Sequence, residues 1–380
     1  MEFPSVTKIH IGKVCEEYKC QNLTVDSWTE TAINNQETAE ITIEDSYLGE
    51  ENMVEVEEEK YLGDVISRDG KNIKNFKARV NKGTGIVNKI MNMLDGIPFG
   101  QFYFEVALIL RNSLLVSSML CNSEAWYNIT NSELNFLETV DLMLLRKILN
   151  VPKTTPKEML YLELGCIPFR NVIQQRRLSF LYYILQEDPK SLVYRFFETQ
   201  RKNRTKNDWV TTILRDLEEL KLNLNFDEIK AMKKSSFVNL LKQSIVKKSL
   251  EELNKKKESH SKVMGLEHKF LKMKRYFLSS NVKASKEEIQ MVFKLRSRVT
   301  DLKTNFKNMY ESYECTACGN EEESQKHILE CRELLKRNKD IKENPVYEKI
   351  FEGNISQQIN IAKIFKENMQ IKEKMMKGEK

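Results

Sequence analysis

Glycine and proline are scarce in this chain, which has 13 and 7 of them among its 380 residues. Strand-rich chains need them for turns and collagen-like chains for their repeats, so both classes are excluded as the main fold. Long apolar runs are missing as well. The most apolar stretch, 102–120, is interrupted by Glu105, Arg111 and Asn112, whereas a transmembrane helix needs about 20 predominantly apolar residues. We therefore expect a mainly α-helical protein without a membrane partner.

A secretory signal is also missing, because no apolar segment follows the amino terminus. Four of the seven cysteines are scattered without disulfide-like spacing: Cys15, Cys20, Cys121 and Cys166. Disulfides are rare in reducing compartments, so the pattern predicts the nucleus or the cytoplasm. Charged residues make up 31% of the chain and the mean hydropathy is −0.51. Much of the helical surface should therefore face solvent.

Familiar catalytic motifs are absent. The sequence has no Asp-Asp pair, no Gly-x-Ser-x-Gly and no His-Glu-x-x-His, and the glycines near Lys82 lack the spacing of a phosphate-binding loop. Three histidines have no acidic neighbour at a useful sequence spacing and are predicted to be surface or packing residues: His10, His260 and His268. Three isolated acids are predicted to be ordinary surface carboxylates: Asp26, Asp45 and Asp64.

The first 66 residues contain the strand signals. Short β-type segments occur at 6–11, 23–25, 41–43, 53–56 and 60–66, and the segments at 41–43 and 53–56 are placed to pair as a hairpin. Ten acidic side chains and one lysine lie between positions 40 and 64, so this region should repel a phosphate backbone. So few strands make a poor independent domain. We predict a small antiparallel β remnant at 1–66.

Residues 67–200 show helical periodicity. Amphipathic or apolar helices are expected at 72–94, 101–122 and 169–185, and Thr130 with Glu133 forms a capping box before another. A short helix should run from 156 to 164, and one more should follow Pro189. The connections are short, which favours antiparallel packing in one helical domain.

Residues 201–310 change in charge, with 27 lysines and arginines against 13 acidic residues. Basic residues alternate with aromatic ones near position 270, where Phe270, Tyr276 and Phe277 are candidates for base stacking, although helical spacing makes at least two of them core residues. A sustained positive surplus favours polyanion binding over a merely solvated helix face. The predicted nucleic-acid contacts are Lys255, Lys256, Lys257, Lys269, Lys272, Lys274, Arg275, Arg296 and Arg298.

The strongest motif lies at 311–340. Cys315 and Cys318 are three positions apart, Gly319 can adopt the positive φ of a tight turn, and His327 and Cys331 lie four apart on a predicted helix. Three cysteines and one histidine match the ligand set of a tetrahedral Zn²⁺. Because all four ligands come from the protein, the zinc is predicted to be structural. The remaining segment, 341–380, is predicted to be an amphipathic helix with an isoleucine-rich stripe.

Several segments resemble the C-terminal part of a non-LTR (LINE-type) retrotransposon reverse transcriptase. Residues 7–13 resemble its last palm strand, and Tyr61, Leu62 and Gly63 resemble the "YLG" of its primer grip. The resemblance implies that 1–66 is a palm remnant, that 67–200 is a thumb-like domain, and that the basic region and a CCHC zinc knuckle follow it.

The catalytic carboxylates of that family have no counterpart here, so no catalytic Mg²⁺ is expected and polymerase activity by this chain alone is not expected. A truncated copy of an element would give such a reading frame. The sequence therefore predicts a catalytically incomplete, reverse-transcriptase-derived protein that binds RNA or DNA, largely independently of sequence. Two alternatives remain: a retained helical scaffold with a protein partner, and the C-terminal fragment of an active RNA-directed DNA polymerase.

Overall fold

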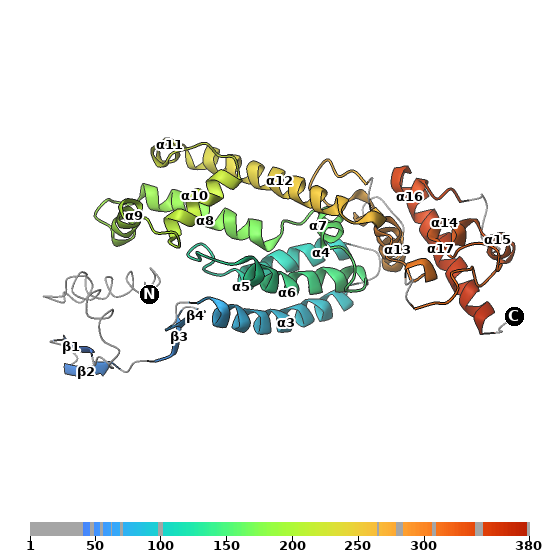
Figure 1. Cartoon of the computed structure of the whole chain (residues 1–380), viewed down its shortest axis with the longest axis horizontal. Helices are drawn as coiled ribbons and strands as arrows, with labels where there is room; N and C mark the ends of the chain where they lie inside the picture. Colours follow the sequence, from blue (N-terminus) through green and yellow to red (C-terminus); the bar gives the residue numbers. More distant parts are fainter. Residues whose placement is uncertain are drawn as a thin grey trace. The chain divides into compact units, whose positions relative to one another are not determined.

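The computed structural model describes residues 41–45, 49–53, 56–61, 63–68, 71–97, 102–263, 266–278, 284–305, 309–338 and 345–377. The protein is mostly helical (Figure 1), as predicted. The longer helices are α3 (Ile73–Asp95), α4 (Tyr103–Leu110), α6 (Asn131–Leu149), α7 (Lys157–Leu164), α8 (Phe169–Gln186), α9 (Leu192–Lys202), α10 (Trp209–Glu219), α12 (Lys234–Glu258), α13 (Lys286–Ser297) and α17 (Ile355–Met376). Shorter helices are α5 (Ser117–Met119), α11 (Phe226–Ala231), α14 (Gln325–Glu330), α15 (Arg332–Arg337) and α16 (Lys349–Glu352).

The chain forms two compact units. Unit 1 is drawn from Met1–Lys82, Ser118–Leu137 and Phe169–Ile245, and unit 2 from Gly83–Ser117, Glu138–Pro168 and Val246–Lys380. Four helices, α3, α5, α6 and α12, contribute residues to both units.

Two antiparallel hairpins make up the described strands. In the first, β1 (Ile41–Asp45) pairs with β2 (Gly49–Met53), so the second strand begins earlier than the predicted 53–56. The predicted single strand at 60–66 is wrong, because β3 (Glu58–Tyr61) turns back into β4 (Asp64–Ser67). The reversal occurs at Gly63, whose φ of +92° strongly favours glycine. The predicted strands at 6–11 and 23–25 lie outside the described residues.

The predicted helices are confirmed with small shifts of their ends. Thr130 and Glu133 form the expected capping box at the start of α6, since each side chain accepts a hydrogen bond from the other residue's backbone N–H. The predicted helix at 101–122 is less regular. It contains a π-helical segment, η1 (Arg111–Val116), between α4 and α5. No helix in the described part of the chain is both long and apolar enough to cross a membrane.

In unit 1, Asp64 is a structural hub, which corrects its prediction as an ordinary surface carboxylate. Its carboxylate accepts hydrogen bonds from Arg79 at 2.6 Å, Asn75 at 2.7 Å and Asn122 at 2.8 Å. Arg79 also lies over the ring of Trp126, which packs on Phe76. The carboxylate therefore ties the β3–β4 hairpin to helix α3 and to the segment before α6. Asp26 lies outside the described residues, as does the side chain of Asp45.

In unit 2, helix α7 lies at the centre of the core, because all its residues from 158 to 164 are buried. The Arg111 guanidinium makes a bidentate ion pair with buried Asp141, at 2.7 and 2.6 Å, and Tyr161 of α7 donates to the same carboxylate. Helix α17 packs on α13 and on α14, α15 and α16, as Figure 1 shows. Its predicted apolar stripe is confirmed as core through Ile359, Ile361, Ile364 and Phe365.

Candidate metal centre and basic surface

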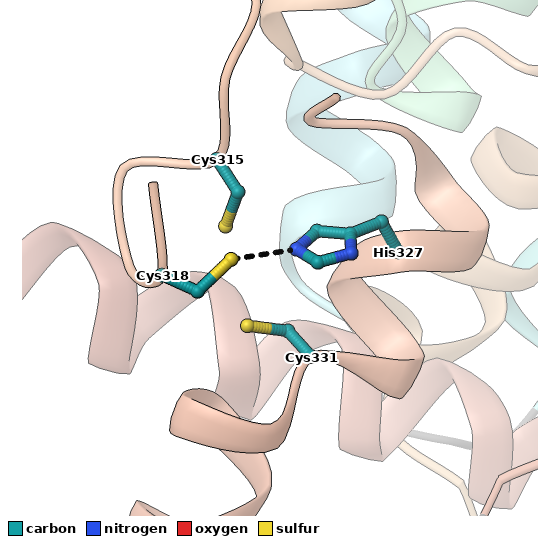
Figure 2. A group of neighbouring side chains, drawn as sticks. All are labelled: Cys315, Cys318, His327 and Cys331. Atoms are coloured by element: carbon teal, nitrogen blue, oxygen red, sulfur yellow. Dashed lines mark hydrogen bonds between the residues drawn. The ribbon is translucent and has the colours of Figure 1, made fainter. Parts of the chain in front are cut away.

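The four predicted ligands lie together in unit 2. One ligand atom from each of Cys315, Cys318, His327 and Cys331 can be chosen so that all four lie within 4.8 Å of one another (Figure 2). The Cys318 sulfur is 3.3 Å from Nε2 of His327. These residues form a possible metal-binding site, as the sequence predicted.

The first cysteine pair is held by a tight backbone turn. Gly319 donates its N–H to the carbonyl of Cys315 at 2.7 Å, and its φ is +69°, as expected for this turn. The Cys315 N–H in turn donates to the carbonyl of Glu321 at 2.7 Å, beside an antiparallel bridge between Glu314 and Glu322. The local backbone hydrogen bonds thus bring both sulfurs to one side of the turn.

The second pair is positioned by α14. Ser324 caps this helix by accepting the N–H of His327 at 3.1 Å. The prediction that Cys331 lies within the same helix as His327 is wrong, because Cys331 is the C-cap of α14 and also the N-cap of α15. The chain bends at this residue, since its ψ of 113° is extended rather than helical. The sulfur still faces His327, because both side chains converge on the first cysteine pair (Figure 2).

Two of the thiols differ strongly in acidity. Burial acts to raise the pKa of Cys318, but backbone N–H groups of Asn320 and Glu321, together with His327, outweigh it and lower the pKa to about 7. Burial raises the pKa of Cys331 to about 11, although backbone N–H groups at the start of α15 oppose this. Hydrogen bonds from backbone N–H groups to sulfur favour the thiolate form that binds metals.

A second layer of contacts orients the histidine. Nδ1 of His327 lies 2.9 Å from the Glu321 carboxylate, while Nε2 faces the sulfurs. A carboxylate on one ring nitrogen directs the lone pair of the other toward a metal. Glu321 was not among the predicted site residues, although an acidic residue six positions before a candidate histidine ligand was a usable signal.

The metal-site segment is joined firmly to the rest of unit 2. The buried carboxylate of Glu323 forms an ion pair with Lys372 of α17 at 2.9 Å and accepts the backbone N–H of Lys303 at 3.2 Å. Asn368 of α17 donates to the carbonyl of Ile328 at 2.8 Å. Ile328 and Leu329 of α14 are fully buried. The site is therefore supported by polar and apolar contacts with α17.

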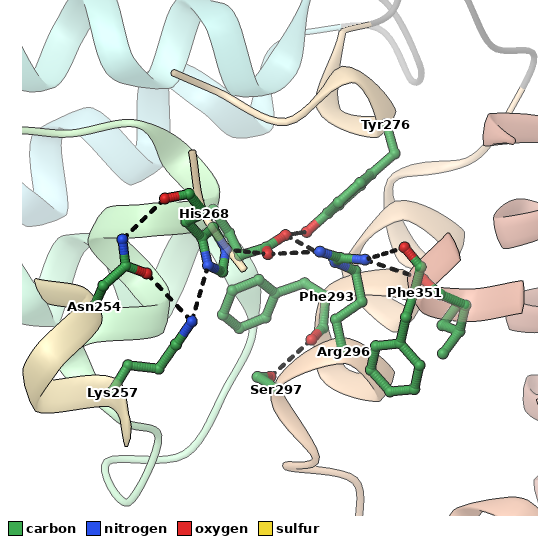
Figure 3. Close-up of polar contacts among 10 residues, drawn as sticks. Asn254, Lys257, His268, Tyr276, Phe293, Arg296, Ser297 and Phe351 are labelled. Carbon is green, nitrogen blue, oxygen red and sulfur yellow. Dashed lines mark hydrogen bonds and ion pairs between the residues drawn. The ribbon is translucent and has the colours of Figure 1, made fainter. Parts of the chain in front are cut away.

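A second polar cluster contains Arg296, one of the predicted nucleic-acid contacts, and lies beside another, Lys257. Arg296 makes a bidentate ion pair with Glu163, with both N–O distances at 3.0 Å, and donates to the carbonyl of Ile350. His268 Nε2 lies 2.7 Å from the same carboxylate, and Tyr276 donates to it at 2.5 Å (Figure 3). We call Glu163, His268, Tyr276 and Arg296 the Glu163 cluster.

This arrangement corrects the prediction for Arg296 and for Lys257. Arg296 is buried, and its guanidinium group forms an ion pair with the Glu163 carboxylate. Lys257 is buried as well, and its ammonium group contacts Asn254 at 3.2 Å and His268 Nδ1 at 3.5 Å. A cation in the core cannot reach a phosphate without breaking its internal contacts. His268, predicted to be a surface or packing residue, is buried in the core, and it also has a buried acidic partner in Glu163.

The electrostatics of the cluster follow from burial and pairing. Burial acts to raise the pKa of Glu163, but Arg296 and His268 outweigh it and hold that pKa well below its usual range. Burial lowers the pKa of His268, and Lys274 and Lys257 act in the same direction. No local sequence pattern indicates the cluster, because Glu163 and His268 are 105 positions apart.

Other predicted phosphate ligands are at the surface of unit 2: Lys255, Lys256, Lys269, Lys272 and Arg275 are exposed. Lys274 is half-buried, and Arg298 is half-buried over the ring of Phe351. Of the three aromatic candidates, Tyr276 and Phe277 are core residues, as expected for at least two, whereas Phe270 is 68% exposed. Tyr61 and Gly63 lie at the turn of the β3–β4 hairpin in unit 1, and Leu62 lies outside the described residues.

Comparison of the chain with protein-family models, with curated proteins and with solved structures finds no match in any of the three.

Proposed function

We propose that Cys315, Cys318, His327 and Cys331 hold a structural Zn²⁺. Three sulfurs and one imidazole nitrogen are a common donor set for this ion, at bond lengths of roughly 2.3 and 2.0–2.1 Å. Around a tetrahedral centre, those lengths separate the ligand atoms by about 3.5–3.8 Å. The 3.3 Å between Cys318 and His327 and the 4.8 Å limit for the whole set are compatible with small adjustments on binding.

The role assigned to the ion is to hold a fold together. Four protein ligands leave no coordination position for a substrate or a reactive water. Helices α14 and α15 have only six residues each, which is too short for independent stability. Metal binding would therefore supply folding free energy to this segment and, through Glu323 and Asn368, fix its docking on α17.

We further propose that the protein binds RNA or DNA through the exposed cations of unit 2. The observation that carries this proposal is the group of exposed basic side chains on the end of α12 and the segment after it: Lys255, Lys256, Lys269, Lys272 and Arg275. Neutralising phosphates with such side chains releases counterions and gives affinity without sequence specificity. Net charge in 201–310 favours the same partner.

The resemblance of several segments to non-LTR reverse transcriptases supports an evolutionary origin for a protein that combines a zinc site with a nucleic-acid-binding surface. We propose that the protein derives from such an enzyme and retains nucleic-acid binding without polymerisation. Two-metal phosphoryl transfer needs carboxylates that hold both ions. In the described part of the chain, the Cys₃His set is the only group of three or more candidate metal ligands, and it contains no carboxylate.

The test is a salt titration of binding. Fluorescence anisotropy with labelled RNA and DNA strands of about 20 nucleotides, longer than a typical binding site, would give the affinity at each salt concentration. Replacing Lys269, Lys272 and Arg275 together by Gln should weaken binding and reduce the log–log salt slope by up to about 2. The control is Lys77, Lys82 and Lys89→Gln, three exposed lysines of α3. Equal losses in both triple variants, or none in either, would remove the proposed surface and favour a protein partner.

A further inference from the structure

The segment from 266 to 274 is irregular in conformation but held at both ends. On its first side, the His268 ring is buried against Glu163, and the His268 carbonyl accepts a hydrogen bond from Asn254 of α12 at 2.9 Å (Figure 3). On its second side, the Lys274 N–H donates to the carbonyl of Glu163 at 2.9 Å. Both ends are thus fixed to α7 and one also to α12. We call residues 268–274 the anchored loop.

The second half of the anchored loop packs against Gly165. Its φ is +66°, and a Cβ atom built on it would lie 2.2 Å from the backbone nitrogen of Met273 and 2.3 Å from the carbonyl carbon of Lys272. Real Cβ atoms do not approach backbone so closely, so the loop backbone occupies space that only glycine leaves open. The loop is therefore packed backbone-to-backbone on the end of α7.

Side chains of the anchored loop alternate between core and solvent. His268 and Leu271 are buried, and between them Lys269 and Phe270 are exposed. Lys272 follows and is exposed too. Phe270, at 68% exposure, is thus a large aromatic ring directed to solvent between two lysines. One acidic neighbour, Glu267, forms only an exposed, 3.8 Å ion pair with Lys269.

We propose that Phe270 stacks on an unpaired base, which gives the protein a preference for single-stranded over duplex nucleic acid. This proposal rests on the proposed nucleic-acid binding and adds a substrate class to it. Aromatic rings stack on bases of any sequence, but in a duplex each base face is already covered by its neighbours. Lys269 and Lys272 flank Phe270 in the sequence and are exposed, so they are available to neutralise adjacent phosphates.

The anchors explain how an exposed ring can contribute affinity. A stacking side chain on a freely moving loop loses conformational entropy on binding, whereas a loop already fixed at both ends loses less. The buried neighbours His268 and Leu271 also determine the direction in which Phe270 points. If Phe270 were an exposed apolar residue without a binding role, neither the fixed ends of the loop nor the neighbouring exposed lysines would be explained.

The experiment compares Phe270→Leu, which keeps an apolar side chain but removes the ring, with Phe270→Trp, which keeps a stacking surface. Binding is measured by anisotropy on a single strand, on its duplex, and on a strand of the same length whose sugars carry no bases. Phe270→Leu should bind the single strand about 5- to 150-fold more weakly than wild type, as expected for loss of one stack. Phe270→Trp should bind it like wild type or more tightly. Affinity for the base-free strand should not change in either variant.

The matched control is Tyr183→Leu, which removes an aromatic side chain of unit 1 that is 53% exposed, and should leave affinity unchanged. The stacking proposal would be overturned if Phe270→Leu bound the single strand as tightly as wild type does. It would also be overturned if the variant lost as much affinity for the base-free strand as for the normal single strand. If the Lys269, Lys272 and Arg275 variant still binds more weakly in that case, the proposed function stands. Absence of binding by wild type to every strand would overturn both.

Discussion

The Nε2 atom of His268 lies 2.7 Å from a carboxylate oxygen of Glu163 in the core of unit 2. Each of these side chains is completely buried. Because Glu163 also binds Arg296 and Tyr276, one carboxylate of helix α7 connects the anchored loop, the 3₁₀ turn η3 (Arg275–Phe277) and helix α13. The arrangement makes Glu163 the polar centre of unit 2.

Replacing Glu163 by Gln should lower the free energy of unfolding by about 3–5 kcal/mol, because the Arg296 guanidinium would remain buried without its counter-charge. Chemical denaturation followed by circular dichroism measures this change. Glu311→Gln, at an exposed position of unit 2, is the control and should change stability by less than about 0.5 kcal/mol. A similarly small loss in Glu163→Gln would show that the cluster contributes little to folding.

Stability should also fall when the pH is lowered from about 7 to 5. Folding lowers the pKa of His268 below its ordinary value of 6.5. Between the folded pKa and pH 6.5, the unfolded chain therefore binds a proton at this side chain that the folded chain does not. One proton gives a slope of at most about 1.4 kcal/mol per pH unit. The pKa of Glu163 is lowered as well, so its stabilising contribution is retained above about pH 4.5 and lost in more acidic solution.

Melting temperatures of wild type and His268→Gln across this range check the assignment. Glutamine does not titrate and can donate to Glu163, so the variant should lose less stability than wild type between pH 7 and 5. Parallel curves for the two proteins would assign the acid sensitivity to other groups.

Removal of the metal should unfold the segment around α14. Protein purified without chelators should contain one equivalent of zinc, and Cys318→Ser should contain less than half an equivalent and melt at a lower temperature, since a structural metal contributes folding free energy. Elemental analysis and calorimetry measure these two quantities. Cys121→Ser, which changes an exposed cysteine outside the site, should retain the metal. Full zinc content in Cys318→Ser would contradict the proposed ligand set.

Glu321 should tune the affinity for that metal. Its carboxylate contacts Nδ1 of His327 at 2.9 Å but is 72% exposed, so Glu321→Gln should weaken zinc binding by about 10-fold, at the lower end of the range for such contacts. Competition with a chromogenic chelator gives the affinity. Glu322→Gln removes a neighbouring exposed acid that makes no described contact with His327 and serves as the control. Equal affinities in the two variants would show that Glu321 does not orient the histidine.

Local sequence signals determined much of the metal site. The spacing of Cys315 and Cys318, the glycine after them and the four-residue interval from His327 to Cys331 are properties of a short segment, whose backbone conformation depends mainly on neighbouring residues. The same holds for the capping box at Thr130 and Glu133 and for the amphipathic α17. Nearby turn, cap and helix preferences could be evaluated without knowing what packs against them.

Tertiary structure decided what the remaining charges do. Lys256 and Lys257 are neighbouring lysines, yet Lys257 is buried beside His268 and Lys256 is exposed. Asp64 looked like an isolated acid because its partners Arg79 and Asn122 are 15 and 58 positions away. The sequence by itself determined the helical fold and the set of candidate metal ligands, since both depend on short-range periodicity and spacing. Only folding could decide which cations reach solvent, because burial depends on the segments, distant in sequence, that cover each side chain.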